Sequence, residues 1–352
     1  MPDRADANER MVPLFAAAGP QRGRGRRSGR AAGVPTAAVP LRPRGVGAIL
    51  DTGIEVLRAR FLVCVGTCVL LWLPVRSTYP LFGAHKFMAA GGPGQASVLI
   101  WGVVTGVLLP VLIQTLGAAF VTLIVYGHML GRAVSFGEAL RVSAGKLFAM
   151  LLVAFLTGMV VAGAMIVLGL PGLLCPPFLL AALALGLYAT WKLWIAPAAL
   201  MLEPSPGRAR YARRPPRGAL ERLLVWSMIT LEDVGQAFFR SFRLNRASFL
   251  RWLGVWAGQA LIVLMFQAVS SAGDQPQLRS AVLEAWPVDT RLFDTVHVLT
   301  SSLFLGLVTA FSAVVITVFY LDARIRTEGL DLRMRLERLR MAHAGTAPEL
   351  AR

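Results

Sequence analysis

The sequence predicts an all-α fold: a polytopic membrane helix bundle with about six transmembrane helices and amphipathic interfacial helices. Hydrophobic residues make up 56% of the 352 residues and charged residues only 16%, whereas soluble domains carry about 25% charged residues. Several apolar runs approach or exceed the roughly 20 residues that a helix needs to cross a bilayer. The Lys and Arg residues gather in alternate connections between these runs, which is typical of membrane proteins.

Residues 1–44 are expected to form a disordered cytoplasmic tail, because they are rich in Arg, Gly and Pro and poor in residues that could form a core. The Arg/Gly tract at 21–30 suits RNA or anionic lipid headgroups. We favour headgroups and do not expect nucleic acid as a partner. The first 40 residues hold no apolar core of signal-peptide length, so we expect insertion to begin at the first span. A membrane domain follows at 45–340, with a loose tail at 341–352.

Residues 46–60 are predicted to form an amphipathic helix that lies on the inner leaflet and leads into the first span. Thr52 and Glu55 fit a helix-start signal, or they are an accident of the helix interior. The apolar stripe of this helix consists of Val46, Ile49, Leu50, Ile54 and Leu57.

Six apolar segments are predicted to span the membrane. The first is short for a bilayer and needs its flanking residues to complete the crossing. The second contains Pro110, which predicts a kink. The six spans cover residues 61–82, 98–127, 147–169, 178–202, 252–271 and 295–321.

Small residues and prolines mark several details of these spans. Pairs spaced four residues apart allow helix backbones to approach closely, although such pairs are common in apolar helices. They are Gly102 with Gly106, Gly158 with Ala162, and Gly254 with Gly258. Ser135 and Glu138 match a helix-start signal. Prolines at 171, 176 and 177 predict a tight turn between the third and fourth spans.

A second basic region occupies residues 203–251 and begins with an Arg/Pro-rich insertion at 203–228. The apolar stretch at 223–231 is too short to cross a bilayer. It lies in the interface or packs on the bundle, and the sequence does not decide between these positions. The aromatic and basic residues at 232–251 suit the headgroup region.

The charge distribution predicts that both termini are cytoplasmic and that the protein resides in the inner membrane. With that topology, the cytoplasmic segments hold 31 Lys and Arg residues, the outside loops hold four, and Lys192 lies within a span. This bias follows the positive-inside rule. It also explains most of the net charge of +17 without nucleic acid.

The sequence contains no recognised catalytic motif. The four histidines and three cysteines lack the spacing of zinc sites, and nucleophile elbows, phosphate loops and dinucleotide fingerprints are missing. We therefore predict no catalytic, cofactor-binding or metal-binding residues and no cofactor.

Four polar side chains within the spans are candidate functional residues, because polar groups at membrane depth are costly. Lys192 lies near the cytoplasmic end of its span and is expected to anchor the helix at the interface, with an ion relay as the alternative. The three glutamines are Gln114, Gln259 and Gln267. Interhelical hydrogen bonds are favoured over substrate binding for Gln114 and Gln259.

Three stretches at 42–61, 229–254 and 318–337 together resemble the bacterial six-helix membrane proteins related to the membrane domain of glycerophosphodiester phosphodiesterases. The resemblance covers about residues 42–340. Its most specific motif consists of Tyr320, Asp322, Arg324, Arg326, Glu328, Gly329 and Asp331, and a second consists of Arg240, Ser241, Arg243 and Leu244. The chain departs from the family pattern at Gly45 and Ala48, where Ser and Glu are usual. The glutamate of the family matches either Glu203 or Glu232.

Many proteins of this family stand alone and have no assigned activity. The resemblance does not include the phosphodiesterase barrel, which needs about 250 residues, and so it does not imply that activity.

The leading hypothesis is a non-catalytic scaffold or accessory factor in envelope or lipid processes, with a membrane protein or a second copy as a possible partner. Arg240, Arg243, Arg324 and Arg326 would contact anionic headgroups, or would lock the cytoplasmic flanks together through Asp322 and Glu328. Alternatively, they only fix the topology.

Two other functions stay open. A small-solute or lipid transporter or channel would need a polar path through the glutamines. A lipid-acting enzyme would need Glu232, Asp322, Glu328 and Asp331 to converge around an ion.

Overall fold

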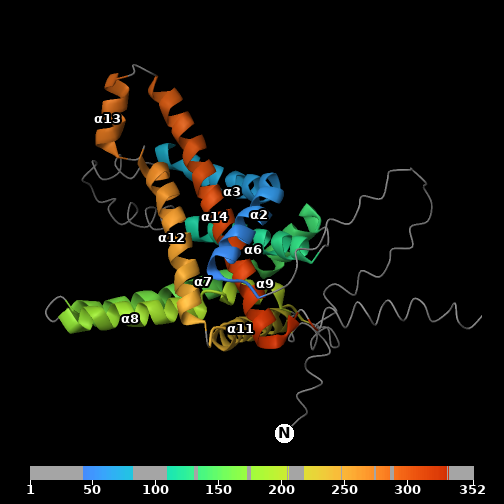
Figure 1. The fold of residues 1–352 in the computed structure, drawn as a ribbon. Coiled ribbons are helices and arrows are strands. Elements are labelled where there is room, and N and C mark those ends of the chain that lie inside the picture. Colours follow the sequence, from blue (N-terminus) through green and yellow to red (C-terminus); the bar gives the residue numbers. More distant parts are fainter. Residues whose placement is uncertain are drawn as a thin grey trace, which may run out of the picture.

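The computed structural model describes residues 43–81, 109–130, 134–172, 176–203, 205, 218–246, 248–272, 275–285, 289–330 and 332. Every regular element in these residues is a helix (Figure 1), so the predicted all-α fold is confirmed. The helices are α2 (Val46–Ala59), α3 (Phe61–Leu81), α6 (Leu109–Met129), α7 (Phe136–Gly172), α8 (Pro176–Leu193), α9 (Ala196–Leu202), α11 (Ala219–Leu244), α12 (Phe249–Ala272), α13 (Pro276–Ala285) and α14 (Thr290–Glu328).

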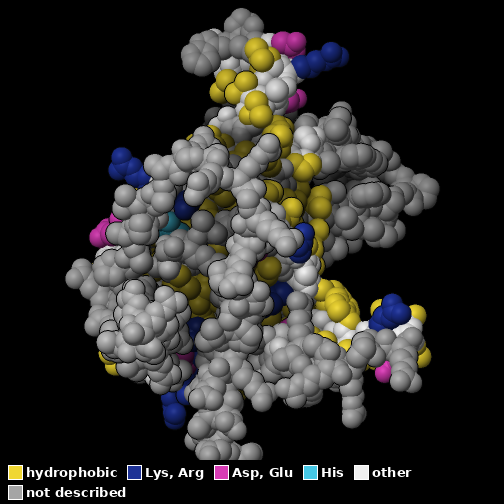
Figure 2. Space-filling model, turned by 90° about the vertical axis from the view of Figure 1, so that its right-hand side faces the viewer, with side chains coloured by type: hydrophobic (Ala, Val, Ile, Leu, Met, Phe, Trp, Pro, Cys, Tyr) yellow, Lys and Arg dark blue, Asp and Glu magenta, His cyan; other side chains and the backbone are white. Residues whose placement is uncertain are grey.

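Five of these helices are long and apolar enough to cross a membrane, as expected for a multi-pass membrane protein. The apolar segments are Val111–Met129, Phe136–Val160, Leu180–Leu202, Phe249–Ala268 and Thr290–Glu328. Helices α2 and α3 meet the same criterion only together, with a bend of 83° between them, and would make a sixth crossing. Large apolar side chains such as Leu62 and Leu250 are exposed, and Figure 2 shows hydrophobic side chains at the surface of one face of the molecule.

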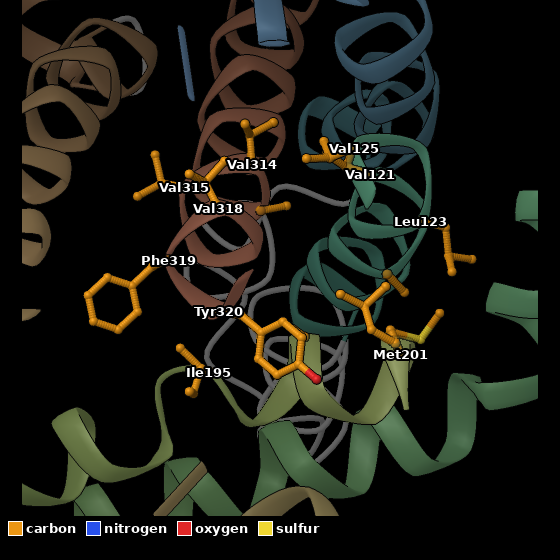
Figure 3. Close-up of a cluster of buried hydrophobic side chains, with 14 of the residues drawn as sticks. Val121, Leu123, Val125, Ile195, Met201, Val314, Val315, Val318, Phe319 and Tyr320 are labelled. Carbon is orange, nitrogen blue, oxygen red and sulfur yellow. The ribbon is translucent and has the colours of Figure 1, made fainter. Parts of the chain in front are cut away.

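Helix α14 forms the centre of the bundle and packs against α2, α3, α6 and α12. Most of its side chains from Ser301 to Ile325 are buried. Figure 3 shows Val314 and Val318 of α14 facing Val121 and Val125 of α6. Such branched side chains are stiff and pack closely with little loss of rotamer freedom.

Helix α2 packs on the bundle with one face, and its other face is exposed. Its position on the inner leaflet stays a prediction. Val46 and Leu50 approach Gly254 and Gly258 of α12, while Gly53 lies against α14. The predicted close-approach pair on α12 therefore has a partner, and that partner is α2. An amphipathic stripe can be covered by neighbouring helices as well as by lipid.

The predicted stripe of α2 is only partly correct. Ile49 and Leu57 are buried, but Ile54 is half exposed. The Thr52 hydroxyl donates a hydrogen bond to the Ala48 carbonyl within the helix. Thr52 is thus an interior residue, and the helix-start signal at this position is an accident of sequence.

Helices α7 and α8 form a hairpin that extends away from α12 and α14 (Figure 1). The Ser135 hydroxyl accepts a hydrogen bond from the Glu138 amide at 3.2 Å, so the predicted start of α7 is confirmed. Pro176 and Pro177 form the first turn of α8, where proline is well tolerated because the missing N–H has no helical partner.

Other predicted connections are more helical than expected. The apolar stretch at 223–231 lies within the long amphipathic helix α11, which packs on α7, α8, α9 and α14. The predicted loop at 272–294 contains α13. In addition, α14 already begins at Thr290, where the Asp289 carboxylate accepts a hydrogen bond from the Arg291 amide.

Several predictions fall on residues outside the described part of the chain. These are the tails at 1–42 and 333–352, the pair Gly102 and Gly106, the side chain of Ala162, and Asp331. Pro110 is the second residue of α6. A kink at Pro110 would involve the residues before Leu109, which lie outside the described part of the chain. A Cβ atom added at Gly158 would have no neighbour within 4 Å, so the described residues do not include a helix that approaches Gly158 closely.

We expect Gly306→Ala to destabilise the contact between α3 and α14. A Cβ atom at Gly306 would lie 2.7 Å from Val69 Cγ2 and 2.8 Å from the Val69 backbone nitrogen. Because backbone cannot rotate away, we expect a loss of about 1–3 kcal/mol, measured by thermal unfolding of the detergent-solubilised protein. Gly158→Ala is the matched control, with open space around its Cβ. Equal unfolding midpoints for the two variants would contradict the packing described here.

Candidate functional site

The carboxyl-terminal end of α14 carries two clusters of charged side chains, most of which are buried. Tyr320, Arg324 and Glu328 follow one another at intervals of four residues and so share one face of the helix. Asp322 and Arg326 are also four residues apart, but they are offset by two residues from Tyr320 and Arg324. They therefore lie on a different face of the helix. Each face collects partners from helices that are distant in the sequence.

The first cluster, called here the Glu203 cluster, consists of Glu203, Arg240, Tyr320, Arg324 and Glu328. Glu203 Oε1 accepts hydrogen bonds from Arg240 Nε at 2.6 Å and from the Tyr320 hydroxyl at 2.7 Å. Arg240 also pairs with Glu328, which in turn accepts a hydrogen bond from Arg324 Nε at 3.0 Å. Figure 3 shows the Tyr320 hydroxyl pointing toward α9, the helix that Glu203 follows.

The charges of the Glu203 cluster balance, with two carboxylates and two guanidinium groups. The side chains of Arg240 and Glu328 are only 14% and 8% exposed. Charges removed from water in this way are tolerated when they are paired and hydrogen-bonded. The cluster therefore holds α9, α11 and α14 together at one fixed geometry.

The second cluster, called here the Asp322 cluster, joins the start of α2 to α12 and α14. The fully buried Asp322 carboxylate pairs with Arg251 at 2.9 Å and with Arg326 at 3.1 Å. It also accepts a hydrogen bond from the Arg44 backbone N–H at 2.7 Å. Arg326 Nη2 donates to the Arg44 carbonyl at 2.8 Å. The backbone that precedes α2 is thus fixed by one acidic side chain and its cationic partner.

Lys146 of α7 positions Glu203 by capping the end of α9. Its ammonium group donates to the Leu200 carbonyl at 2.6 Å and to the Glu203 carbonyl at 3.1 Å. The last carbonyls of a helix lack helical partners, and a cation near them is favourable. Because Lys146 satisfies these carbonyls, the chain leaves α9 with Glu203 directed toward Arg240 and Tyr320.

Two polar residues near the end of α11 cap the end of α8 in a similar way. The Ser241 hydroxyl donates to the Lys192 carbonyl, and Asn245 Nδ2 donates to the Trp191 carbonyl at 2.7 Å. These bonds occupy carbonyls at the point where the chain turns from α8 into α9. They explain why the predicted fourth span is two helices separated by a turn.

The Lys192 side chain is buried, with 7% of its area exposed. Its ammonium group lies 3.6 Å from the centre of the Trp191 ring and donates a hydrogen bond to the Asn245 carbonyl at 3.4 Å. These contacts stabilise a desolvated cation. Anchoring of Lys192 at the membrane surface stays a prediction.

The structure brings together five of the residues proposed from the sequence motifs: Arg240, Asp322, Arg324, Arg326 and Glu328. Their contacts are ion pairs that join the flanks of the helices, the second of the roles expected for them. The exposed Arg243 is part of neither cluster. Headgroup contacts of these arginines stay a prediction.

Lys146, Arg251 and Asn245 were not predicted from the sequence. Glu203 was considered only as one of two matches to a family glutamate, and it is Glu203 that pairs with the motif residues. Glu232 lies half-buried on α11 and belongs to neither cluster. A lysine or arginine close to the end of an apolar run was the only signal available for Lys146 and Arg251.

The three glutamines do not line either described cavity. Gln259 is buried, and its Oε1 has no hydrogen-bond partner among the described residues, whereas Gln114 and Gln267 are exposed. Among the described residues, no three His, Cys, Asp or Glu side chains lie together as metal ligands. The transporter and the lipid-acting enzyme stay untested hypotheses.

We expect Arg240→Gln to destabilise the protein by about 3 kcal/mol, because it removes one cation from between two buried carboxylates. Arg243→Gln, three residues further along α11, removes the same charge from an exposed position and should change stability by less than about 0.5 kcal/mol. Thermal unfolding in detergent measures both. A smaller loss in the double variant with Glu328→Gln than the sum of the single losses would verify the pairing, and additive losses would argue against it.

Comparisons with protein families, curated proteins and solved structures find no match to this chain. The function is therefore argued from the geometry of the charged clusters and of the helices that they hold.

Proposed function

We propose that this chain is an inner-membrane protein with both ends in the cytoplasm that acts as a non-catalytic scaffold or accessory factor in envelope or lipid processes. In this proposal, α11 is the surface that a membrane-protein partner recognises. The observation that carries the proposal is the exposed apolar face of α11, a helix that the Glu203 cluster ties to α9 and α14.

Helix α11 has two apolar faces. One face is buried against the bundle through residues such as Val234, Ala237 and Leu244. The other is exposed, and its side chains at Leu220 and Phe239 each keep 72% of their area open. The exposed face contains Leu220, Leu224, Met228, Leu231, Phe239 and Phe242.

An exposed apolar face of this extent is typical of a surface that binds another protein or a membrane. A helix that served only to cover the bundle would need one apolar face and could be polar elsewhere. The packing of the described residues therefore does not explain the second apolar face of α11. Binding of a partner to this face would explain it.

The Glu203 cluster supports a docking role because it helps to fix the last turns of α11. Arg240 ties this end of the helix to Glu203 and Glu328, and Ser241 and Asn245 tie it to α8. A surface that is ordered before binding loses less conformational entropy when a partner arrives. The ion pairs thus contribute to recognition without any contact to the partner.

We expect a photoreactive residue at Leu231 to crosslink to a specific protein in intact cells. Leu231 lies on the exposed face, whereas Val234, the matched control three residues away, is 3% exposed and should give only crosslinks within the chain. Mass spectrometry of the adducts identifies the partner, and Leu231→Glu should abolish its co-purification. Adducts from Leu231 to lipid alone, with unchanged co-purification in Leu231→Glu, would refute a protein scaffold.

Reporter fusions test the proposed topology. A fluorescent protein inserted at 211–217, or fused after residue 352, should fold and fluoresce in the cytoplasm, and alkaline phosphatase inserted at 286–288 should be active outside. The expectation follows from the segregation of 31 Lys and Arg residues to one side against four on the other. Phosphatase activity at 211–217 would reverse the orientation.

A further inference from the structure

A groove with a volume of about 380 Å³ lies between α3, α6 and the beginning of α7. Its apolar lining includes Leu70, Ile124 and Phe136, and its basic lining consists of the Arg60 guanidinium and the His128 imidazole. The groove lies apart from the Glu203 and Asp322 clusters and shares no residue with them. Neither the fold nor the proposed scaffold role explains its division into a basic and an apolar part.

The basic part of the groove has cationic capacity that the described residues leave unused. No hydrogen bond or ion pair to the Arg60 guanidinium or to the His128 ring is found within the described residues. The Glu55 carboxylate acts electrostatically on His128 but does not line the groove. An anion that reached the groove would therefore meet unoccupied donors, and a guanidinium group binds phosphate oxygens in pairs.

The groove lies at the depth of a lipid headgroup at one end. His128 is the penultimate residue of the candidate span Val111–Met129, and Phe136 is the first residue of the next one. Both residues are therefore close to the point where the chain leaves and re-enters the hydrocarbon region. This placement is the same whichever face of the membrane is cytoplasmic.

The apolar part of the groove can hold much of an acyl chain. Val63, Thr67 and Leu70 line it along one side of α3, and the helix rises about 10 Å from Val63 to Leu70. That length is about two thirds of the roughly 15 Å that one leaflet contributes to the hydrocarbon core. Gly66 leaves the middle of this surface open, since no atom lies within 4 Å of its Cβ position.

We propose that this groove binds one anionic phospholipid, with the phosphate on Arg60 and His128 and an acyl chain along α3 from Val63 to Leu70. The combination of a guanidinium and an imidazole at one end and an apolar wall at the other fits an amphiphile. A free phosphate ion would leave the apolar wall uncovered. The site requires only that α6 lies in the bilayer and does not depend on the scaffold function.

Native mass spectrometry of the full chain in detergent micelles tests the headgroup. We expect phosphatidylglycerol to bind more tightly than phosphatidylcholine, and Arg60→Gln to weaken phosphatidylglycerol binding about tenfold, equivalent to about 1.4 kcal/mol. Arg58→Gln is the matched control, because Arg58 is exposed near the same bend and does not line the groove. Equal weakening in the two variants would show a general effect of charge and overturn the site.

A second variant tests the acyl chain. Gly66→Leu should fill the groove and reduce the binding of both lipids, while the open space at its Cβ preserves the unfolding midpoint. Unchanged lipid binding in this variant would overturn the proposed position of the chain. Displacement of phosphatidylglycerol by excess inorganic phosphate would show a free-anion site and would also overturn the proposal.

Discussion

The architecture depends on the pairing of buried charges at the end of α14. A single carboxylate such as Asp322, with no exposed side-chain area, is very costly in a medium that cannot solvate it. Its partners come from three places in the chain, the segment before α2, α12 and α14 itself. Because each partner must be present at the same time, the position of one helix restricts the positions of the others.

Helix α14 combines this charged end with a middle that is adapted for close packing. Gly306 brings the backbone of α3 within van der Waals distance, and small or branched residues continue the contact toward α6. Its 39 residues extend over about 58 Å, nearly twice the thickness of the hydrocarbon core. The helix therefore has length to spare, so that its charged end can lie beyond the region where unpaired charge would be most costly.

The fold class followed from local properties of the sequence, and the charged clusters largely did not. Hydropathy over about 20 residues identifies a helix that needs an apolar environment, and the charged motif residues of α14 were expected to pair with other flanks or with headgroups. Glu203 is more than 50 residues from Tyr320 of α14, and Lys146 is more than 50 residues from Glu203. No local sequence pattern encodes such pairings. The packing of α2 against α12 and α14 was not predicted, because an amphipathic period is the same whether lipid or another helix covers the apolar face.

The net charge of +17 overstates the basic surface that is available for binding. Arg240, Arg251 and Arg324 form ion pairs inside the protein, so they contribute to stability but offer little to an external anion. Arg60 and Arg243 have no such pair within the described residues. The positive-inside rule counts charges and not their partners. An arginine that is paired inside the protein and an arginine that is free to bind a ligand therefore look alike in the sequence. The described contacts distinguish the two kinds of arginine.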